Sequence, residues 1–389
     1  MTNLPVSLMT PVSAIAGLLL SGLACAQDPA ASEPDFVFPE ELSLVPEDVQ
    51  RAAEEVEADE ASIPLGMTPL EEALYRAQIA WIDEDWVLAQ QYAETAASGG
   101  EITGAVMAGL IARDGRADGV PDLSRAASWF SRAAELEHPL ALYEMGRLAR
   151  QDVPGVDNPR SWFERAARAG HVPGMVAYAL ELRESPIPQE RARAREWAER
   201  AAQQGFAEAM FQFGQLLDLG IGGEADLVSA RSWYERAAQE RHPEAALQAG
   251  IMWAEGIGGP RDDTRAWQFI REAAEMGYAP AQGQYGLLML QGRGGERDAE
   301  MARFWFEQGA MGGDGESRFL LAVTLARQAV DAQDEDMLGQ AYRWALLAHE
   351  DFIGHPVDEV RRSGLQAALE TDLPPVLRER IRSEVDALR

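Results

Sequence analysis

The sequence repeats itself about every 36 residues, and this repetition constrains the fold more than any other feature. Most copies carry an aromatic residue followed four and five places later by two small residues, and seventeen places later by Gly or Ala. We call the eight aromatic side chains the repeat anchors: they are Tyr92, Trp129, Trp162, Trp197, Trp233, Phe269, Trp305 and Trp344. Self-similarity at this period indicates a stack of equivalent supersecondary units.

Each unit predicts a helical hairpin. Segments such as 229–240 are rich in Ala and contain no Pro or Gly, which favours a helix. A break such as His242-Pro243 then leads into a second amphipathic run, and Pro is well suited to the first turn of a helix. One hairpin cannot bury a large anchor ring, whose truncation in a core costs about 3–5 kcal/mol, so the copies must pack on one another. The repeats therefore predict an all-α fold, a right-handed α-α superhelix (solenoid) of stacked helical hairpins.

Glycine-rich loops recur one unit apart at 220–223, 256–259 and 292–295. We expect their glycines to supply positive φ angles at turns. A phosphate-binding role is disfavoured, because three equal copies without a preceding strand fit a structural role better.

These residues resemble the consensus of the Sel-one-like repeat (SLR) family, relatives of the tetratricopeptide repeats. The resemblance covers residues 69–350, although the unit around Trp162 is short and lacks the Gly-x-Gly loop. In residues 209–242 it rests on Gly214, Gly220, Gly222, Asp226, Trp233-Tyr234, Ala237-Ala238 and His242. It implies a solenoid that mediates protein complexes. It also brings an alternative, a cell-envelope hydrolase acting on β-lactams or peptidoglycan, since some disulfide-rich members of the family are linked to such activity.

The chain divides into four predicted regions. Residues 12–24 are uncharged and apolar and precede Ala24-Cys25-Ala26, which indicates a signal peptide over 1–26 and a periplasmic or otherwise exported protein. This run is too short to span a bilayer, and no longer apolar run occurs, so we predict no transmembrane span. The alternative to cleavage after Ala26 is acylation of Cys25, giving a lipid-anchored scaffold at the outer membrane. An acidic, Pro-rich linker (27–67), the repeat solenoid (69–350) and C-terminal capping helices (351–389) follow.

Charge and composition exclude several functions. The chain has 64 Asp and Glu residues against 34 basic ones, all Arg, and its net charge is −30. Coulomb repulsion disfavours nucleic acid and anionic lipid, so we expect a protein or peptide partner that is basic or neutral. Without Lys there is no phosphate-loop lysine, no Schiff base and no S-x-x-K nucleophile pair.

No catalytic residue, metal ligand or cofactor is predicted, and the chain is not expected to be an enzyme. Neither H-E-x-x-H nor G-x-S-x-G occurs. His138, His171 and His242 each lie nine residues after an anchor, a repeated slot that indicates half-buried rings at helix junctions.

Candidate binding residues come from the face of the helix that follows each anchor helix. Positions 12, 16, 17 and 20 after the anchor are mostly apolar or small, and they leave positions 15 and 18 on the opposite side. Position 15 holds Gln212, Gln248 and Gln284 in consecutive units, with Gln215 and Arg147 at position 18. This row predicts an amide ladder that binds the backbone of an extended segment. The alternative is that Gln is only a polar helix former on a solvent-exposed face. The predicted function is an exported protein–protein interaction scaffold, adaptor or regulator.

Overall fold

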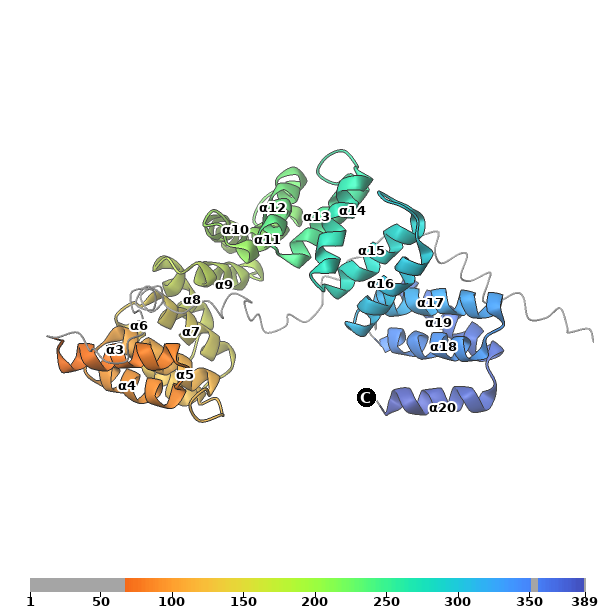
Figure 1. Cartoon of the computed structure of the whole chain (residues 1–389). Helices are drawn as coiled ribbons and strands as arrows, with labels where there is room; N and C mark the ends of the chain where they lie inside the picture. The colour runs from red at the N-terminus through yellow and green to blue at the C-terminus, as the bar shows by residue number, and fades with distance from the viewer. Residues whose placement is uncertain (1–66, 351–355, 388–389) are drawn as a thin grey trace, which may run out of the picture. The chain divides into compact units, whose positions relative to one another are not determined.

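The computed structural model describes residues 67–350 and 356–387, where it contains α-helices and no strand (Figure 1). Helices of two kinds alternate. The A helices are α3 (Pro69–Ile82), α5 (Ile102–Asp114), α7 (Pro139–Arg150), α9 (Val172–Arg183), α11 (Ala207–Asp218), α13 (Pro243–Glu255), α15 (Ala279–Gln291) and α17 (Gly315–Ala332). The B helices carry the anchors and are α4 (Trp86–Ser98), α6 (Leu123–Glu135), α8 (Pro159–Arg168), α10 (Pro188–Ala202), α12 (Leu227–Gln239), α14 (Asp263–Glu275), α16 (Ala299–Met311) and α18 (Glu335–Glu350). Two further helices, α19 (Pro356–Asp372) and α20 (Pro375–Asp386), follow.

The described helices fall into two compact units, α3–α11 and α12–α20. Within each unit, consecutive A and B helices pack against one another, which confirms the predicted all-α fold of stacked hairpins. The first helix, α3, begins after an N-cap at Thr68. The Thr68 hydroxyl accepts from the backbone N–H of Glu71 at 3.3 Å, and the Glu71 carboxylate accepts from the backbone N–H of Thr68 at 2.7 Å, forming a capping box.

The aromatic anchors are not the side chains at the centre of the core. They are half-buried and pack at its margin, as Trp129 and Trp305 do. In three hairpins the next residue along the chain is a completely buried ring: Phe130, Phe163 and Phe306 are 0% exposed. The expectation that the anchor fills the core is therefore wrong: in these hairpins the residue after the anchor does so.

Glycines in the A helices receive these buried side chains. A methyl group at Gly146 would lie 2.4 Å from Cε1 of Phe163, and one at Gly286 would lie 2.8 Å from the same atom of Phe306. Each glycine stands seventeen residues after one anchor, and the ring it meets belongs to the next hairpin. The equivalent pairs Ala179/Ala198 and Ala322/Ala345 have Ala at both positions. Side-chain size is thus complementary between neighbouring hairpins.

The glycine loops press on the backbone of the preceding B helix. Gly258 has a φ of 70°, and a Cβ there would lie 2.2 Å from the carbonyl oxygen of Leu227. A Cβ on Gly222, which has a φ of 77°, would lie at the same distance from the carbonyl oxygen of Arg191. The predicted positive φ angles are confirmed, and the close approach leaves no room for a side chain.

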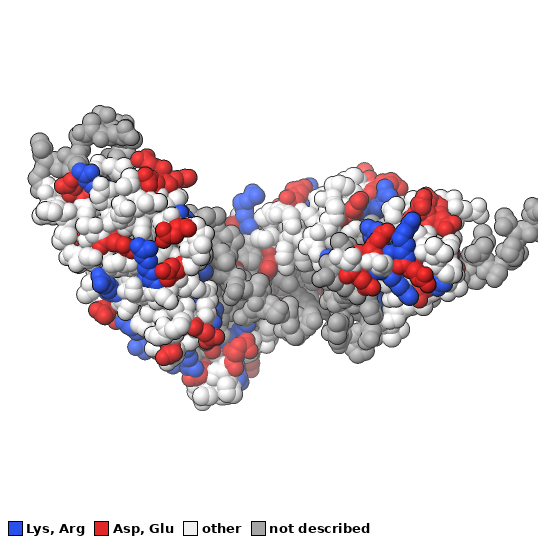
Figure 2. Space-filling model, turned by 90° about the horizontal axis from the view of Figure 1, so that it is seen from below, with Lys and Arg blue, Asp and Glu red and all other residues white. Residues whose placement is uncertain are grey.

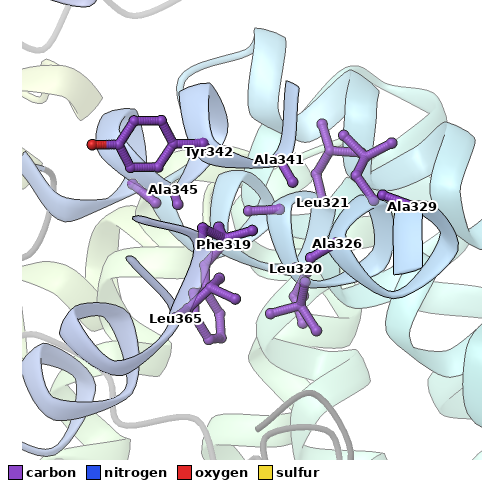
Figure 3. Close-up of a cluster of buried hydrophobic side chains, with 14 of the residues drawn as sticks. Phe319, Leu320, Leu321, Ala326, Ala329, Ala341, Tyr342, Ala345 and Leu365 are labelled. Atoms are coloured by element: carbon purple, nitrogen blue, oxygen red, sulfur yellow. The ribbon is translucent and has the colours of Figure 1, made fainter. Parts of the chain in front are cut away.

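The C-terminal core joins three helices of the second unit. Phe319 of α17, Tyr342 of α18 and Leu365 of α19 lie in one buried cluster (Figure 3). Helix α20 packs against α18 and adds Ile381 and Val385. The predicted signal peptide, Cys25 and the linker up to residue 66 lie outside the described residues, so this part of the domain division stays a prediction.

Candidate partner-binding surface

The position predicted to form an open amide row is mostly enclosed by neighbouring helices. Gln212 is 6% exposed and Glu144, in the same slot of α7, is 2% exposed. Gln248 and Gln284 are half-buried. Position 15 therefore does not lie on a solvent-exposed face of these helices: α7 packs against α6 and α8, and α11 packs against α9 and α10.

Hydrogen bonds within the protein occupy two of these side chains. The Gln212 amide donates from Nε2 to Glu208 Oε1 at 2.7 Å, and both residues are buried. Oε1 of Glu144 accepts from Arg113 Nη1 at 2.7 Å and from Arg147 Nη1 at 3.4 Å. Gln212 thus supports its own helix, and Arg147 is held by a buried carboxylate.

Four of the five predicted binding residues keep some accessible surface. Arg147 and Gln215 belong to the first unit, and Gln248 and Gln284 belong to the second. The structure brings Gln248 and Gln284 to equivalent places on α13 and α15, one hairpin apart. At these positions the second unit therefore carries two accessible amides, Gln248 and Gln284, and not the predicted row of three.

Histidine rings cap three of the A helices. Nδ1 of His138, His171 and His242 accepts from the backbone N–H three residues on, at 3.4, 3.1 and 3.2 Å. The predicted helix-junction position is confirmed. Burial, together with the charge of nearby His138, lowers the pKa of His171 to about 3. A neutral ring keeps the Nδ1 lone pair that the cap requires.

Charged side chains connect neighbouring hairpins, and on the visible face positive and negative groups are interleaved (Figure 2). Arg150 of α7 donates from Nε and Nη2 to Glu181 Oε1 of α9 at 3.0 and 2.8 Å. Arginines also stack on the anchors: Arg132 lies 4.5 Å from the Trp129 ring and Arg236 lies 3.8 Å from the Trp233 ring. These stacks were missed, although the Arg three residues after the anchor is visible in the sequence.

The described residues offer neither a metal site nor a membrane-spanning helix. They contain no group of three or more His, Cys, Asp or Glu residues arranged to hold a metal ion. Among them, too, every helix falls short of the length and apolar character that crossing a membrane requires. A pocket of about 420 Å³ does occur between α18 and α20, with Trp344, Arg343 and Glu384 in its wall.

A family model for the Sel1 repeat matches this chain six times, at residues 106–138, 160–171, 174–206, 207–242, 243–278 and 279–314. The chain is a Sel1 repeat protein. Most of its Sel1 units consist of one A helix and the B helix that follows, and the shortest match falls on α8, which has only ten residues and no glycine loop before it.

Solved structures show the same fold. One is a protective antigen present in uropathogenic Escherichia coli strains that displays an SLR fold; it is 22% identical, with a TM-score of 0.64, and the match covers 88% of this chain and 71% of the antigen. Another is a Sel1 repeat protein from Oxalobacter formigenes, also 22% identical, with a TM-score of 0.61 and coverage of 87% and 96%. None of the curated proteins compared with this chain matches it.

Proposed function

We propose that this Sel1 repeat protein is an exported scaffold or adaptor that binds a basic or neutral protein, or an extended peptide, on the A helices of its repeats. The observation that carries the proposal is the pair Gln248 and Gln284, polar and half-exposed at equivalent positions of consecutive hairpins. A partner backbone running across α13 and α15 would find an amide on each helix that can both donate and accept. Arg147 and Gln215 are the candidate contacts in the first unit.

A paired substitution tests this surface. Gln248→Ala with Gln284→Ala should weaken capture of the partner from the cell envelope by about tenfold, if each amide contributes a typical net hydrogen bond. The control is Gln239→Ala with Gln268→Ala, which removes two exposed amides from B helices of the same unit. Equal partner recovery by both variants would contradict the proposed surface.

Export and anchoring need a separate measurement. Intact-mass analysis of the protein from its own envelope should find a chain that starts at Gln27, as cleavage after Ala26 requires. An acylated Cys25 would support the lipid-anchored alternative.

The hydrolase alternative is tested by activity. Purified protein incubated with a chromogenic β-lactam or with peptidoglycan should give no turnover above buffer. Turnover that co-purifies with the protein would replace the scaffold proposal.

A further inference from the structure

An exposed apolar stripe distinguishes one hairpin from the others. On α16, Met301, Phe304 and Met311 are 41%, 45% and 59% exposed. Their spacing of three and seven residues places them along one side of the helix. Soluble proteins rarely leave such side chains grouped on the surface unless something binds them.

Comparison between the repeats shows that the positions of Phe304 and Met311 are polar in the other hairpins, whereas the position of Met301 also holds an exposed Leu88 on α4. The residue just before the anchor is exposed in every described hairpin, and apart from Phe304 it is Gln91, Ser128, Ser161, Glu196, Ser232, Gln268 or Arg343. The residue six places after the anchor is exposed too, and apart from Met311 it is Ser98, Glu135, Arg168, Gln203, Gln239 or Glu275. The fold therefore does not require apolar side chains at these places, and α16 has them for another reason.

The neighbouring hairpin shows what can lie against this side of a B helix. On α18 the side holding Gly339, five residues before the anchor, is covered by α20: a Cβ on Gly339 would lie 3.3 Å from Cδ1 of Ile381. Helix α20 is amphipathic, with Ile381 and Val385 buried and Leu377 packed beside them. An ion pair between Arg343 and Glu384 borders the contact. On α16 the equivalents of Gly339, Gln340 and Arg343 are Glu300, Met301 and Phe304, and the structure packs α16 against α15 and α17.

Charge indicates the kind of helix that fits. One edge of the stripe carries Glu300, whose side chain is 76% exposed and lies 3.7 Å from Arg303, and the exposed Glu307, which pairs with no cation among the described residues. The net negative charge of this edge favours Arg or Lys on the facing flank of the ligand.

We propose that the stripe of Met301, Phe304 and Met311 is a docking site for an amphipathic helix of another protein, apolar on one face and basic along one edge of that face. The helix lies along α16 as α20 lies along α18. Flexible Met side chains around one aromatic ring suit such a helix-in-groove contact. This site is on a B helix and does not depend on the A-helix surface proposed above.

The test uses a fluorescein-labelled amphipathic peptide with Leu at positions i, i+4, i+7 and i+11 and Arg on one flank. Its fluorescence anisotropy is measured against the full chain and against Met301→Ser with Phe304→Ser and Met311→Gln, residue types that other hairpins carry at these positions. We expect the triple variant to bind at least about tenfold more weakly, with an unchanged Tm. Arg265→Ala with Gln268→Ala on α14 is the matched control and should bind as the unaltered protein does.

Three outcomes would overturn the proposal. Equal binding of the peptide to the triple variant removes the stripe as the site. Equal binding of a scrambled peptide of the same composition, with no apolar face, shows that charge alone attracts it. A protein that dimerises through the stripe, and becomes monomeric in the triple variant, assigns the surface to a second copy of this chain. Because Gln248→Ala with Gln284→Ala leaves the stripe intact, failure here and failure of the A-helix surface are distinguishable.

Discussion

At the scale of single residues, the hairpins are held in register by matched side-chain sizes. Phe163 is completely buried against Gly146 of the preceding hairpin, and Tyr143 lies beside it at a ring-centroid distance of 5.9 Å. Close-packed interiors tolerate an added methyl poorly, because neither a helix backbone nor an enclosed ring can move far.

Gly146→Ala should therefore lower the free energy of unfolding by about 1–3 kcal/mol, the usual cost of overpacking. Combining it with Phe163→Leu should cost less than the sum of the two single changes, since the smaller side chain makes room for the methyl group. Gly364→Ala is the control: no atom lies within 4 Å of a Cβ there, and Ala favours a helix by roughly 1 kcal/mol. Urea unfolding measures the stability of all four variants. Strict additivity of the two free-energy changes in the double variant would refute the size match.

At the scale of helices, the start of α9 depends on the protonation state of its cap. The backbone N–H of Gly174 donates to Nδ1 of His171, and the ring of Tyr143 lies 4.9 Å from the histidine ring. The pKa of His171 is lowered to about 3 in the folded protein, below the ordinary value of 6.5. The unfolded chain thus takes up a proton that the folded chain does not, and stability falls as pH drops from 6.5 towards 3.

His171→Asn should remove part of this pH dependence, because Asn caps a helix and does not titrate. Between pH 7 and pH 5 the unaltered protein should lose about 1–2 kcal/mol more than the variant. Thermal unfolding at the two pH values gives the difference, with His242→Asn as a comparison at another cap. Identical losses in the protein and the His171 variant would show that this ring does not control acid sensitivity.

At the scale of the whole molecule, each hairpin is stabilised by its neighbours. Helices that pack together are close in the chain within each unit, as is typical of repeat proteins whose stability is a sum of local terms. A defect in one hairpin should then spread only to adjacent ones.

Phe163→Leu should speed amide hydrogen exchange in α7, α8 and α9, by an amount corresponding to about 1 kcal/mol, and leave α15–α17 unchanged. Phe306→Leu should do the converse. Each variant is the control for the other, and accelerated exchange across both units in either variant would mean that the array opens cooperatively.

The sequence by itself determined the repeat, the helical hairpins, the loop glycines and the helix start at Pro243. These depend on local chemistry, that is, on helix periodicity, backbone φ preferences and side chains that reach a nearby N–H. Membership of the family followed from the same short-range pattern.

Only the tertiary structure decided which side chains are enclosed. Periodicity placed Gln212 on an open face, but α11 packs against α9 and α10, and that amide is buried beside Glu208. The periodic pattern also predicted that the anchor would be the buried ring. In the structure the residue after the anchor is the one enclosed by the packing, as at Phe163. Burial depends on which helices of other hairpins pack against a given face. The helical period shows which residues share a face, but it does not show what packs against that face.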